Sequence, residues 1–251
     1  GPYSNLNWAV TDTTFSADGY IAANNDGATY VAYLFADNSS EDAEEQMIKC
    51  GSYTGDANVT QAIDLGWEPQ WVLIKDATST SNWYILDTMR GWTVNGAYGG
   101  DPTLFADSSN AESNQVAGEP TATGFNAIND GINLSGKTYI YMAIRAPMMV
   151  EPEAATDVFN TIAYTGGGVG PVSGFKTDFN ITGQLSGSDK FYTSARITGT
   201  KTLKTNTTAA EADQGGSLPW DRMDGVWNTG VNGYTLWFWQ RAKGYMDVVA
   251  Y

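Results

Sequence analysis

The sequence predicts an all-β protein made of tandem antiparallel β-sandwich units of the jelly-roll kind. Its apolar stretches are short and rich in Val, Ile, Thr, Trp and Tyr, and clusters of Gly, Asn, Asp and Ser separate them, which is typical of strands and turns. The chain also repeats itself in units of roughly 100 residues. Many short strands in a unit of that size bury their alternating faces when two sheets pack together. A β-barrel for each unit is the alternative.

The elements expected inside a unit follow from local patterns. The continuous apolar run at 71–74 predicts an inner strand that is covered on both faces, whereas 139–145 partly alternates between apolar and polar residues. The segments 234–240 and 30–36 carry the same aromatic strand pattern as 139–145. Each of two polar segments, 41–49 and 110–116, could form a turn or two of helix.

The repeat is anchored at four places in the same order. Ser52-Tyr53-Thr54-Gly55 returns as Ala163-Tyr164-Thr165-Gly166, and the stretch 82–91 aligns with 190–199 without a gap. Thr103-Leu104 with Glu112 matches Thr202-Leu203 with Glu211 at equal spacing. Six aromatic residues occupy matching places, and we assign them to the cores between the sheets, with a stacking platform for sugar as the alternative: Trp67, Trp71 and Trp83 in the first unit, and Phe175, Phe179 and Phe191 in the second.

The repeat sets the expected organisation of the chain. Two complete repeats are joined by polar, proline-bearing or acidic connectors, and a partial repeat stands at each end. A terminal strand of seven residues is not stable alone, so we expect it to join a sheet of its own chain or of a neighbour. The boundaries are 1–37 (C-terminal part of a preceding repeat), 38–46 (acidic linker), 47–147 (first repeat), 148–157 (linker), 158–244 (second repeat) and 245–251 (opening strand of a further repeat).

The composition excludes several classes of function. With 28 acidic and 13 basic residues the net charge is −15, so a phosphate backbone would be repelled and nucleic acid is a poor partner. Histidine is absent, which excludes catalysis by a serine–histidine or cysteine–histidine pair. Cys50 is the single cysteine, which excludes an internal disulfide and a cysteine-based metal cluster. We expect neither a cofactor nor a metal. No apolar run is long enough for insertion into a membrane.

The best local candidate for ligand binding is the glycine-rich loop at 91–101. It carries Trp92, Tyr98 and Asp101 in a region where the second unit is shorter. Aromatic rings on such a loop suit stacking against sugar faces, while the carboxylate takes hydroxyl groups. The alternative is that Trp92 and Tyr98 cover a sheet edge or a neighbouring domain.

A glycan-cleaving enzyme is the alternative function, because paired carboxylates need no histidine. The candidate acids are Asp87, Asp101, Glu112 and Glu119. Glu112 recurs as Glu211 in a stretch rich in Thr, Ser and Asn, which favours a repeated turn or cap over a single active site. A cleft with two carboxylates about 5 to 9.5 Å apart would indicate the enzyme.

The segment Gly66-Trp67-Glu68-Pro69-Gln70-Trp71-Val72-Leu73-Ile74-Lys75, then Trp83 and Asp87-Thr88-Met89-Arg90-Gly91, resembles a repeat of phage and prophage tail or tail-fibre proteins of the marine-phage type. The likeness extends to 53–55 and 139–147. The second unit departs from it, since Ala195 and Thr198 replace Asp87 and Arg90. Asp87 and Arg90 could clamp a turn or hold a ligand.

The resemblance implies a non-enzymatic structural and adhesive module of a virion appendage, located in the virion and outside the cell. Tandem β-domains would then present loops to a glycan or protein of the host surface. Other virion subunits, or copies of the chain itself, are the remaining expected partners.

Overall fold

The computed structural model describes residues 9–11, 13–16, 26–32, 34–38, 45–58, 60–94, 100–128, 131–147, 149–165, 170–184, 191–213, 220, 222–225 and 233–249. Contacts divide the chain into two units, 1–36 and 37–251. The described elements are β-strands with short 3-10 turns and no α-helix, so the all-β prediction is confirmed. Neither large sheet closes into a barrel.

The N-terminal unit contains a two-stranded hairpin, in which β1 (Ala9–Val10) pairs with β2 (Phe15–Ser16). The predicted strand at 30–36 is absent from the residues that the structure describes there. Its apolar side chains are exposed instead, with 75% of Val31 and 75% of Leu34 accessible. A strand needs a neighbouring strand for its backbone hydrogen bonds, and an aromatic pattern alone does not specify that neighbour.

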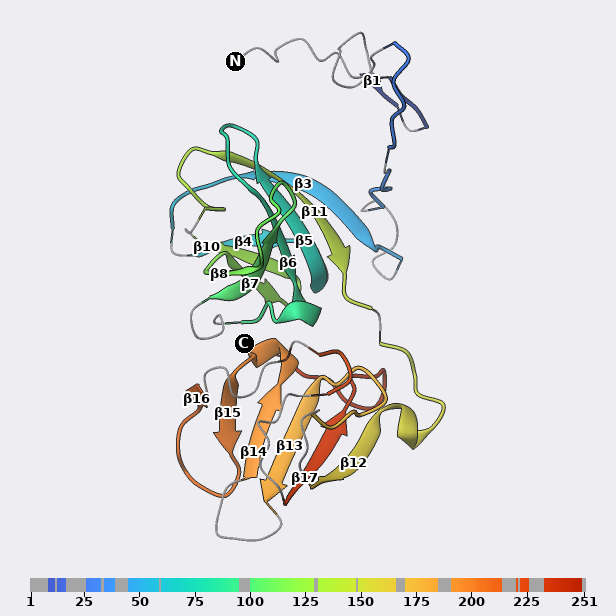
Figure 1. Cartoon of the computed structure of the whole chain (residues 1–251), viewed down its shortest axis with the longest axis vertical. Helices are drawn as coiled ribbons and strands as arrows, with labels where there is room; N and C mark the ends of the chain where they lie inside the picture. The colour runs from blue at the N-terminus through green and yellow to red at the C-terminus, as the bar shows by residue number, and fades with distance from the viewer. Residues whose placement is uncertain are drawn as a thin grey trace. The chain divides into compact units, whose positions relative to one another are not determined.

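The first half of the larger unit is a β-sandwich of a six-stranded and a three-stranded sheet (Figure 1). Both sheets are antiparallel, and the six-stranded one has the order β3-β11-β5-β6-β7-β8. The three-stranded sheet has the order β4-β10-β9. The strands are β3 (Ile48–Thr54), β4 (Thr60–Asp64), β5 (Pro69–Asp76), β6 (Trp83–Asp87), β7 (Asp101–Phe105), β8 (Ser113–Gln115), β9 (Gly118–Thr121), β10 (Gly124–Ile128) and β11 (Thr138–Arg145).

The core of this sandwich lies between its two sheets. Val72 and Ile74 of β5 face Phe125 of β10, and all three side chains are fully buried. Tyr53 stacks on Tyr139 with ring centroids 5.1 Å apart, and its hydroxyl donates to the carbonyl of Ile132 at 2.6 Å. The alternation of buried and partly exposed residues along β5 is that of a strand with one face in the core. The prediction that the run at 71–74 is covered on both faces is therefore wrong.

The second half contains a six-stranded sheet with the order β12-β17-β13-β14-β15-β16 (Figure 1). When the strands of each six-stranded sheet are numbered in chain order, the two sheets have the same spatial order. Two matching turns, η1 (Thr88–Arg90) and η3 (Arg196–Thr198), follow β6 and β14. The strands are β12 (Phe159–Tyr164), β13 (Phe179–Gln184), β14 (Phe191–Ala195), β15 (Lys201–Lys204), β16 (Ala212–Asp213) and β17 (Tyr234–Trp239), and η2 (Ala155–Asp157) precedes them.

The second half differs from the first in what covers the inner face of its sheet. Segments 170–178 and 220–225, in which the structure describes no strand, take the place of a second sheet. Arg196 is buried and holds them through hydrogen bonds from its guanidinium to the carbonyls of Thr177 (2.9 Å), Trp220 (2.9 Å), Arg222 (2.6 Å) and Met223 (3.0 Å). One buried cation thus satisfies backbone groups that would otherwise lie unpaired in the interior.

Three further predictions differ from the structure. Residues 48–50 belong to β3 and residues 113–115 to β8, so neither 41–49 nor 110–116 forms a helix in its described residues. At the C-terminal end, 245–249 forms no strand. An isolated bridge between Ala242 and Met246 closes a turn there, because this segment folds back on its own neighbours.

The six matched aromatic residues are only partly in the cores. Trp67 is buried, but the side chains of Trp83 and Phe191 are 36% and 38% exposed, and Trp71 and Phe179 are half-buried. Side chains alternate between the two faces of a strand. Since Val72, Ile74 and Leu86 take the core positions, these aromatics lie on the opposite, outer face of each sheet. The core assignment is wrong for these four.

Candidate functional site

Of the three sequence-predicted ligand residues, the structure describes Trp92 and Asp101, and both are buried. Trp92 is fully buried, and its indole N–H donates to the carbonyl of Gly118 at 2.8 Å. Its ring lies 6.5 Å from that of Phe125, within the core of the first sandwich. A ring with no exposed surface cannot stack on a sugar, so the expectation of a stacking platform at Trp92 is wrong. The alternative placed Trp92 over a sheet edge or a neighbouring domain, whereas the ring lies inside the core of its own sandwich. Tyr98 lies outside the described residues.

Asp101 is also buried, with 1% of its surface exposed at the start of β7. One carboxylate oxygen accepts the backbone N–H of Thr93 at 3.2 Å. Burial raises the pKa of Asp101 to about 7, and the nearby charge of Glu119 adds to this, while the bond from Thr93 opposes it. A carboxyl group so enclosed has no surface for a sugar hydroxyl, so the assignment of Asp101 as a ligand residue is wrong.

Two of the other candidate acids form contacts that stabilise the fold. The carboxylate of Asp87 accepts the N–H of Met89 at 2.8 Å and caps the turn η1, and Glu112 forms an ion pair with Arg90. Asp87 and Arg90 therefore hold the turn separately, without a bond to each other. In the second half Ala195 stands at the cap position of η3 and makes no side-chain bond there.

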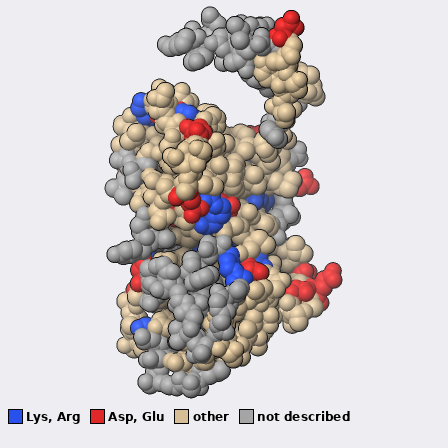
Figure 2. Space-filling view, in the orientation of Figure 1, with Lys and Arg blue, Asp and Glu red and all other residues tan. Residues whose placement is uncertain are grey.

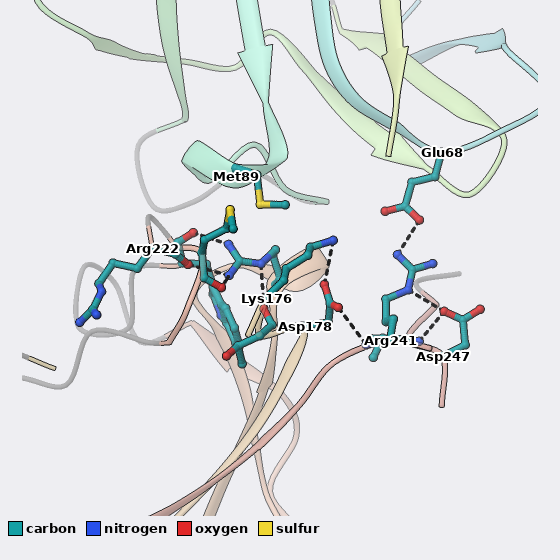
Figure 3. Close-up of polar contacts among 12 residues, drawn as sticks. Glu68, Met89, Lys176, Asp178, Arg222, Arg241 and Asp247 are labelled. Atoms are coloured by element: carbon teal, nitrogen blue, oxygen red, sulfur yellow. Dashed lines mark hydrogen bonds and ion pairs between the residues drawn. The ribbon is translucent and has the colours of Figure 1, made fainter. Parts of the chain in front are cut away.

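A cleft with a volume of about 700 Å³ lies along Glu68, the linker after β11, Lys176, Asp178 and Arg241. Arg241 is its central cation. Its guanidinium binds Glu68 at 2.7 Å and Asp247 at 2.6 Å, as Figure 3 shows. Burial opposes ionisation of Arg241, but these two carboxylates outweigh burial and raise the pKa of its guanidinium.

A second ion pair lies beside the first. Lys176 contacts Asp178 at 3.1 Å, and the other oxygen of Asp178 accepts the backbone N–H of Arg241 at 2.9 Å (Figure 3). Each of these carboxylates is thus engaged by a cation or a backbone donor. The cleft has the mixed polarity of a binding groove.

The outward faces of the two large sheets form the second candidate region. Outer face 1 and outer face 2 are defined as the residues at equivalent register positions that point away from the cores. Outer face 1 is Ile48, Cys50, Ser52, Trp71, Leu73, Lys75, Trp83, Ile85, Asp87, Leu104, Ile140, Met142 and Ile144. Outer face 2 is Phe159, Thr161, Ala163, Phe179, Ile181, Gly183, Phe191, Thr193, Ala195, Leu203, Thr235, Trp237 and Trp239.

The aromatic rings of outer face 2 pack on one another. Trp239 lies between Phe159 and Phe179, at 5.1 Å and 5.4 Å, with its ring tilted by about half a right angle to each. Phe191 stacks with Trp237 at 6.3 Å and an interplanar angle of 19°. The result is a mainly apolar surface on a chain whose net charge is −15.

Charged side chains are scattered over the surface. In the view of Figure 2, some acidic and basic residues lie next to each other, while other acidic residues stand without a basic neighbour. Among the described residues no group of three or more Cys, Asp or Glu could hold a metal ion. In the same part of the chain no helix is long and apolar enough to cross a membrane.

Sequence reasoning missed the cleft and reached the outer faces only through the alternative of a stacking platform for sugar, which included Trp71, Trp83, Phe179 and Phe191. The Arg241–Glu68 pair joins residues 173 positions apart, and nothing in either local sequence marks a partner at that distance. The outer faces could have been found, because the period of two along 71–75 and 140–144 places apolar side chains on both sides of each strand.

A family model with the description "Domain of unknown function (DUF7483)" matches residues 3–147, which is more than half of the chain. The matched span includes the whole first sandwich. No curated protein and no solved structure matched the chain.

Proposed function

The chain belongs to the DUF7483 family, and we propose that it is a non-enzymatic structural and surface-binding module of a virion appendage, such as a phage tail fibre. The observation that carries the proposal is the repeated architecture. Two sheets of identical strand order follow each other, and both turn a mainly apolar face outward. An array of this kind places binding surfaces at regular intervals along an extracellular fibre.

The resemblance of 66–91 to tail-fibre repeats supports the setting in a virion. The mixed-charge cleft around Arg241 and the loops at the sheet ends are the surfaces offered to a glycan or protein of the host. Sugar hydroxyls suit such a cleft, because its carboxylates and guanidinium accept and donate hydrogen bonds in fixed directions.

Glycan hydrolysis is the weaker candidate. Catalysis by paired carboxylates needs one protonated and one ionised group that both reach the substrate. Asp101 is the described acid whose pKa burial raises to about 7, yet it is enclosed. Asp87 and Glu112 are occupied by the contacts that hold η1.

A binding experiment on bacterial surfaces tests the proposal. The purified chain is mixed with intact cells of a panel of bacteria, and the bound fraction is measured after sedimentation of the cells. Parallel samples use cells treated with protease and cells stripped of surface polysaccharide. We expect retention on some surfaces, lost after one of the two treatments, which identifies the receptor as protein or glycan.

The virion setting needs its own measurement. An antibody against the chain should label an appendage of the phage particle that carries the gene in immunogold electron microscopy. Retention on no surface of the panel would contradict the adhesive function, and labelling confined to the interior of infected cells would contradict the location.

A further inference from the structure

We propose that the two halves of the larger unit meet at a pH-sensitive joint, in which ionisation of the buried carboxyl group of Asp101 releases segment 92–94 from the second half. The joint is the contact of segment 92–94 with η3 and with Gly199, which follows it. The proposal concerns how two consecutive repeats are held together, and it does not depend on which host molecule either repeat binds.

Segment 92–94 connects the core of the first half to the second half. The ring of Trp92 is fully buried in the first core, where its indole N–H donates to the carbonyl of Gly118 at 2.8 Å. Two residues later, the backbone N–H of Val94 donates to the carbonyl of Ile197 in η3 at 2.9 Å. Because these residues follow one another, a displacement of the segment breaks the hydrogen bond between the halves.

Thr93 links this segment to Asp101. Its backbone N–H donates to a carboxylate oxygen of Asp101 at 3.2 Å, and each of the two residues has 1% of its surface exposed. The side chain of Thr93 also lies against the second half, since a Cβ atom added to Gly199 would come within 2.9 Å of its hydroxyl oxygen. One residue thus contacts the carboxyl group on one side and the second half on the other.

The surroundings of Asp101 favour the neutral form of its carboxyl group. None of the ion pairs that the described residues form includes Asp101. The register of β7 and β8 places the uncharged Gln115 opposite it, and the nearby charge on β9, Glu119, has the same sign. One backbone donor does not offset the cost of a carboxylate in the interior.

The charged side chains of the two turns are engaged with other groups. Arg90 of η1 pairs with Glu112, and Arg196 of η3 donates to backbone carbonyls of the second half. The carboxylate of Asp87 accepts the N–H of Met89. None of these contacts brings a cation to Asp101, so its ionised form depends on water for stabilisation.

The closed joint also contains polar groups that water would stabilise. Among the described residues, the hydroxyl groups of Thr93 and Thr200 are buried and have no hydrogen-bond partner. Thr200 directly follows Gly199, against which Thr93 lies. Burial of an unpaired hydroxyl group is unfavourable, and water that enters the joint removes this cost. This contact is therefore easier to open than one in which every polar group is bonded.

Rising pH favours the open joint. Burial raises the pKa of Asp101 from 3.8 to about 7 in the closed joint, whereas the hydrated carboxyl group of the open joint keeps the ordinary pKa. The open form therefore releases its proton at lower pH, and the equilibrium constant for opening rises about tenfold per pH unit between about pH 4 and pH 7. Above about pH 7 both forms are ionised, and the constant levels off.

The halves stay connected when the segment opens. Arg241 of the second half pairs with Glu68 of the first at 2.7 Å, and both side chains are 19% exposed. This pair belongs to other segments of both halves than the joint does. Opening therefore loosens the connection between consecutive repeats without separating them, and it becomes more frequent as the pH rises to about 7.

Amide hydrogen exchange, resolved residue by residue with NMR, tests the proposal on the whole chain. The exchange rates of Thr93 and Val94 are measured from pH 5 to pH 8, and each is divided by the rate of an unstructured peptide at the same pH. This relative exchange rate reports the equilibrium constant for opening. It should rise roughly 50-fold between pH 5 and pH 7 and about twofold more up to pH 8, as the two pKa values require.

Two variants identify the titrating group. In Asp101→Asn, which keeps an oxygen for the N–H of Thr93, the relative exchange rate should not change with pH. Glu211→Gln removes an exposed carboxylate and should behave like the unchanged chain. A relative exchange rate that is independent of pH in the unchanged chain overturns the proposal, and this outcome needs no variant to fold. An equal rise in Asp101→Asn overturns it as well.

A comparison with Val72 separates opening of the joint from unfolding of the protein. Val72 is fully buried in β5, so its amide exchanges when the sandwich unfolds. Opening of the joint exposes little surface, so a low concentration of urea should leave the exchange of Thr93 and Val94 unchanged while it accelerates that of Val72. Exchange of Thr93 and Val94 that matches Val72 in rate and in its response to urea overturns the proposal.

Discussion

Replacement of Asp101 by Asn should remove a pH dependence from the stability of the protein. Asn keeps the shape of the side chain and an oxygen that can accept the N–H of Thr93, but it cannot ionise. In the folded chain burial raises the pKa of Asp101 from 3.8 to about 7. Between pH 4 and pH 7 the folded state therefore holds a proton that the unfolded state has released.

The sign and size follow from proton linkage. Stability falls with rising pH wherever the folded state binds more protons, so the contribution of Asp101 is most favourable below pH 4 and worsens up to about pH 7. A pKa unit corresponds to about 1.4 kcal/mol, and the loss between pH 5 and pH 8 is about 3 kcal/mol for these two pKa values. Asp101→Asn should lack this loss.

The assay is urea unfolding followed by tryptophan fluorescence at pH 5 and pH 8. All other groups titrate in both proteins, so the quantity of interest is the difference in unfolding free energy between Asp101→Asn and the unchanged chain at each pH. Glu153→Gln, which removes one charge from an exposed linker residue, is the control. A difference that changes by less than about 0.5 kcal/mol, near the extrapolation error, would show that Asp101 is solvated and refute the reasoning.

Three further predictions concern stability. Trp92→Ala should lower the unfolding free energy by about 3 to 5 kcal/mol through lost burial and a cavity. Trp83→Ala should lower it by less than half of that at low protein concentration. Equal losses for the two variants would place Trp92 at the surface. Arg196→Met should cost about 3 to 5 kcal/mol, because the carbonyls that it binds lose their donor; an unchanged melting temperature would contradict this. Tyr53→Phe, which removes the bond to Ile132, should cost about 1 to 2 kcal/mol in chemical denaturation, and no loss would indicate that water replaces the hydroxyl.

The strand content was predictable because it depends on local composition and on the repeat. Residues 71–74 and 139–145 are strands as expected. Which side of a strand is buried depends on the layer that packs on it, so Trp71 and Val72 could not be told apart from a continuous apolar run. The segment at 30–36 failed for a related reason, because a strand needs partners that local sequence does not reveal.

The candidate site was predictable only in part. The loop at 91–101 was recognised as unusual, yet Trp92 turns inward because the carbonyl of Gly118 accepts its N–H within the core. A glycine-rich sequence is compatible with a loop that covers the core as well as with a loop that binds a ligand. Arg196 was not recognised, since a lone arginine between strands carries no sequence signal of the carbonyls that converge on it.

The central claim, binding to a host surface without chemistry, is tested most directly by light scattering of a surface polysaccharide. The polysaccharide of a bacterium that retains the chain is incubated with it, and the molar mass is followed over many hours during size-exclusion chromatography. We predict that the two elute together and that the polysaccharide keeps its mass. A falling mass, with new reducing ends, would contradict the account and assign the chain to the glycan-cleaving enzymes.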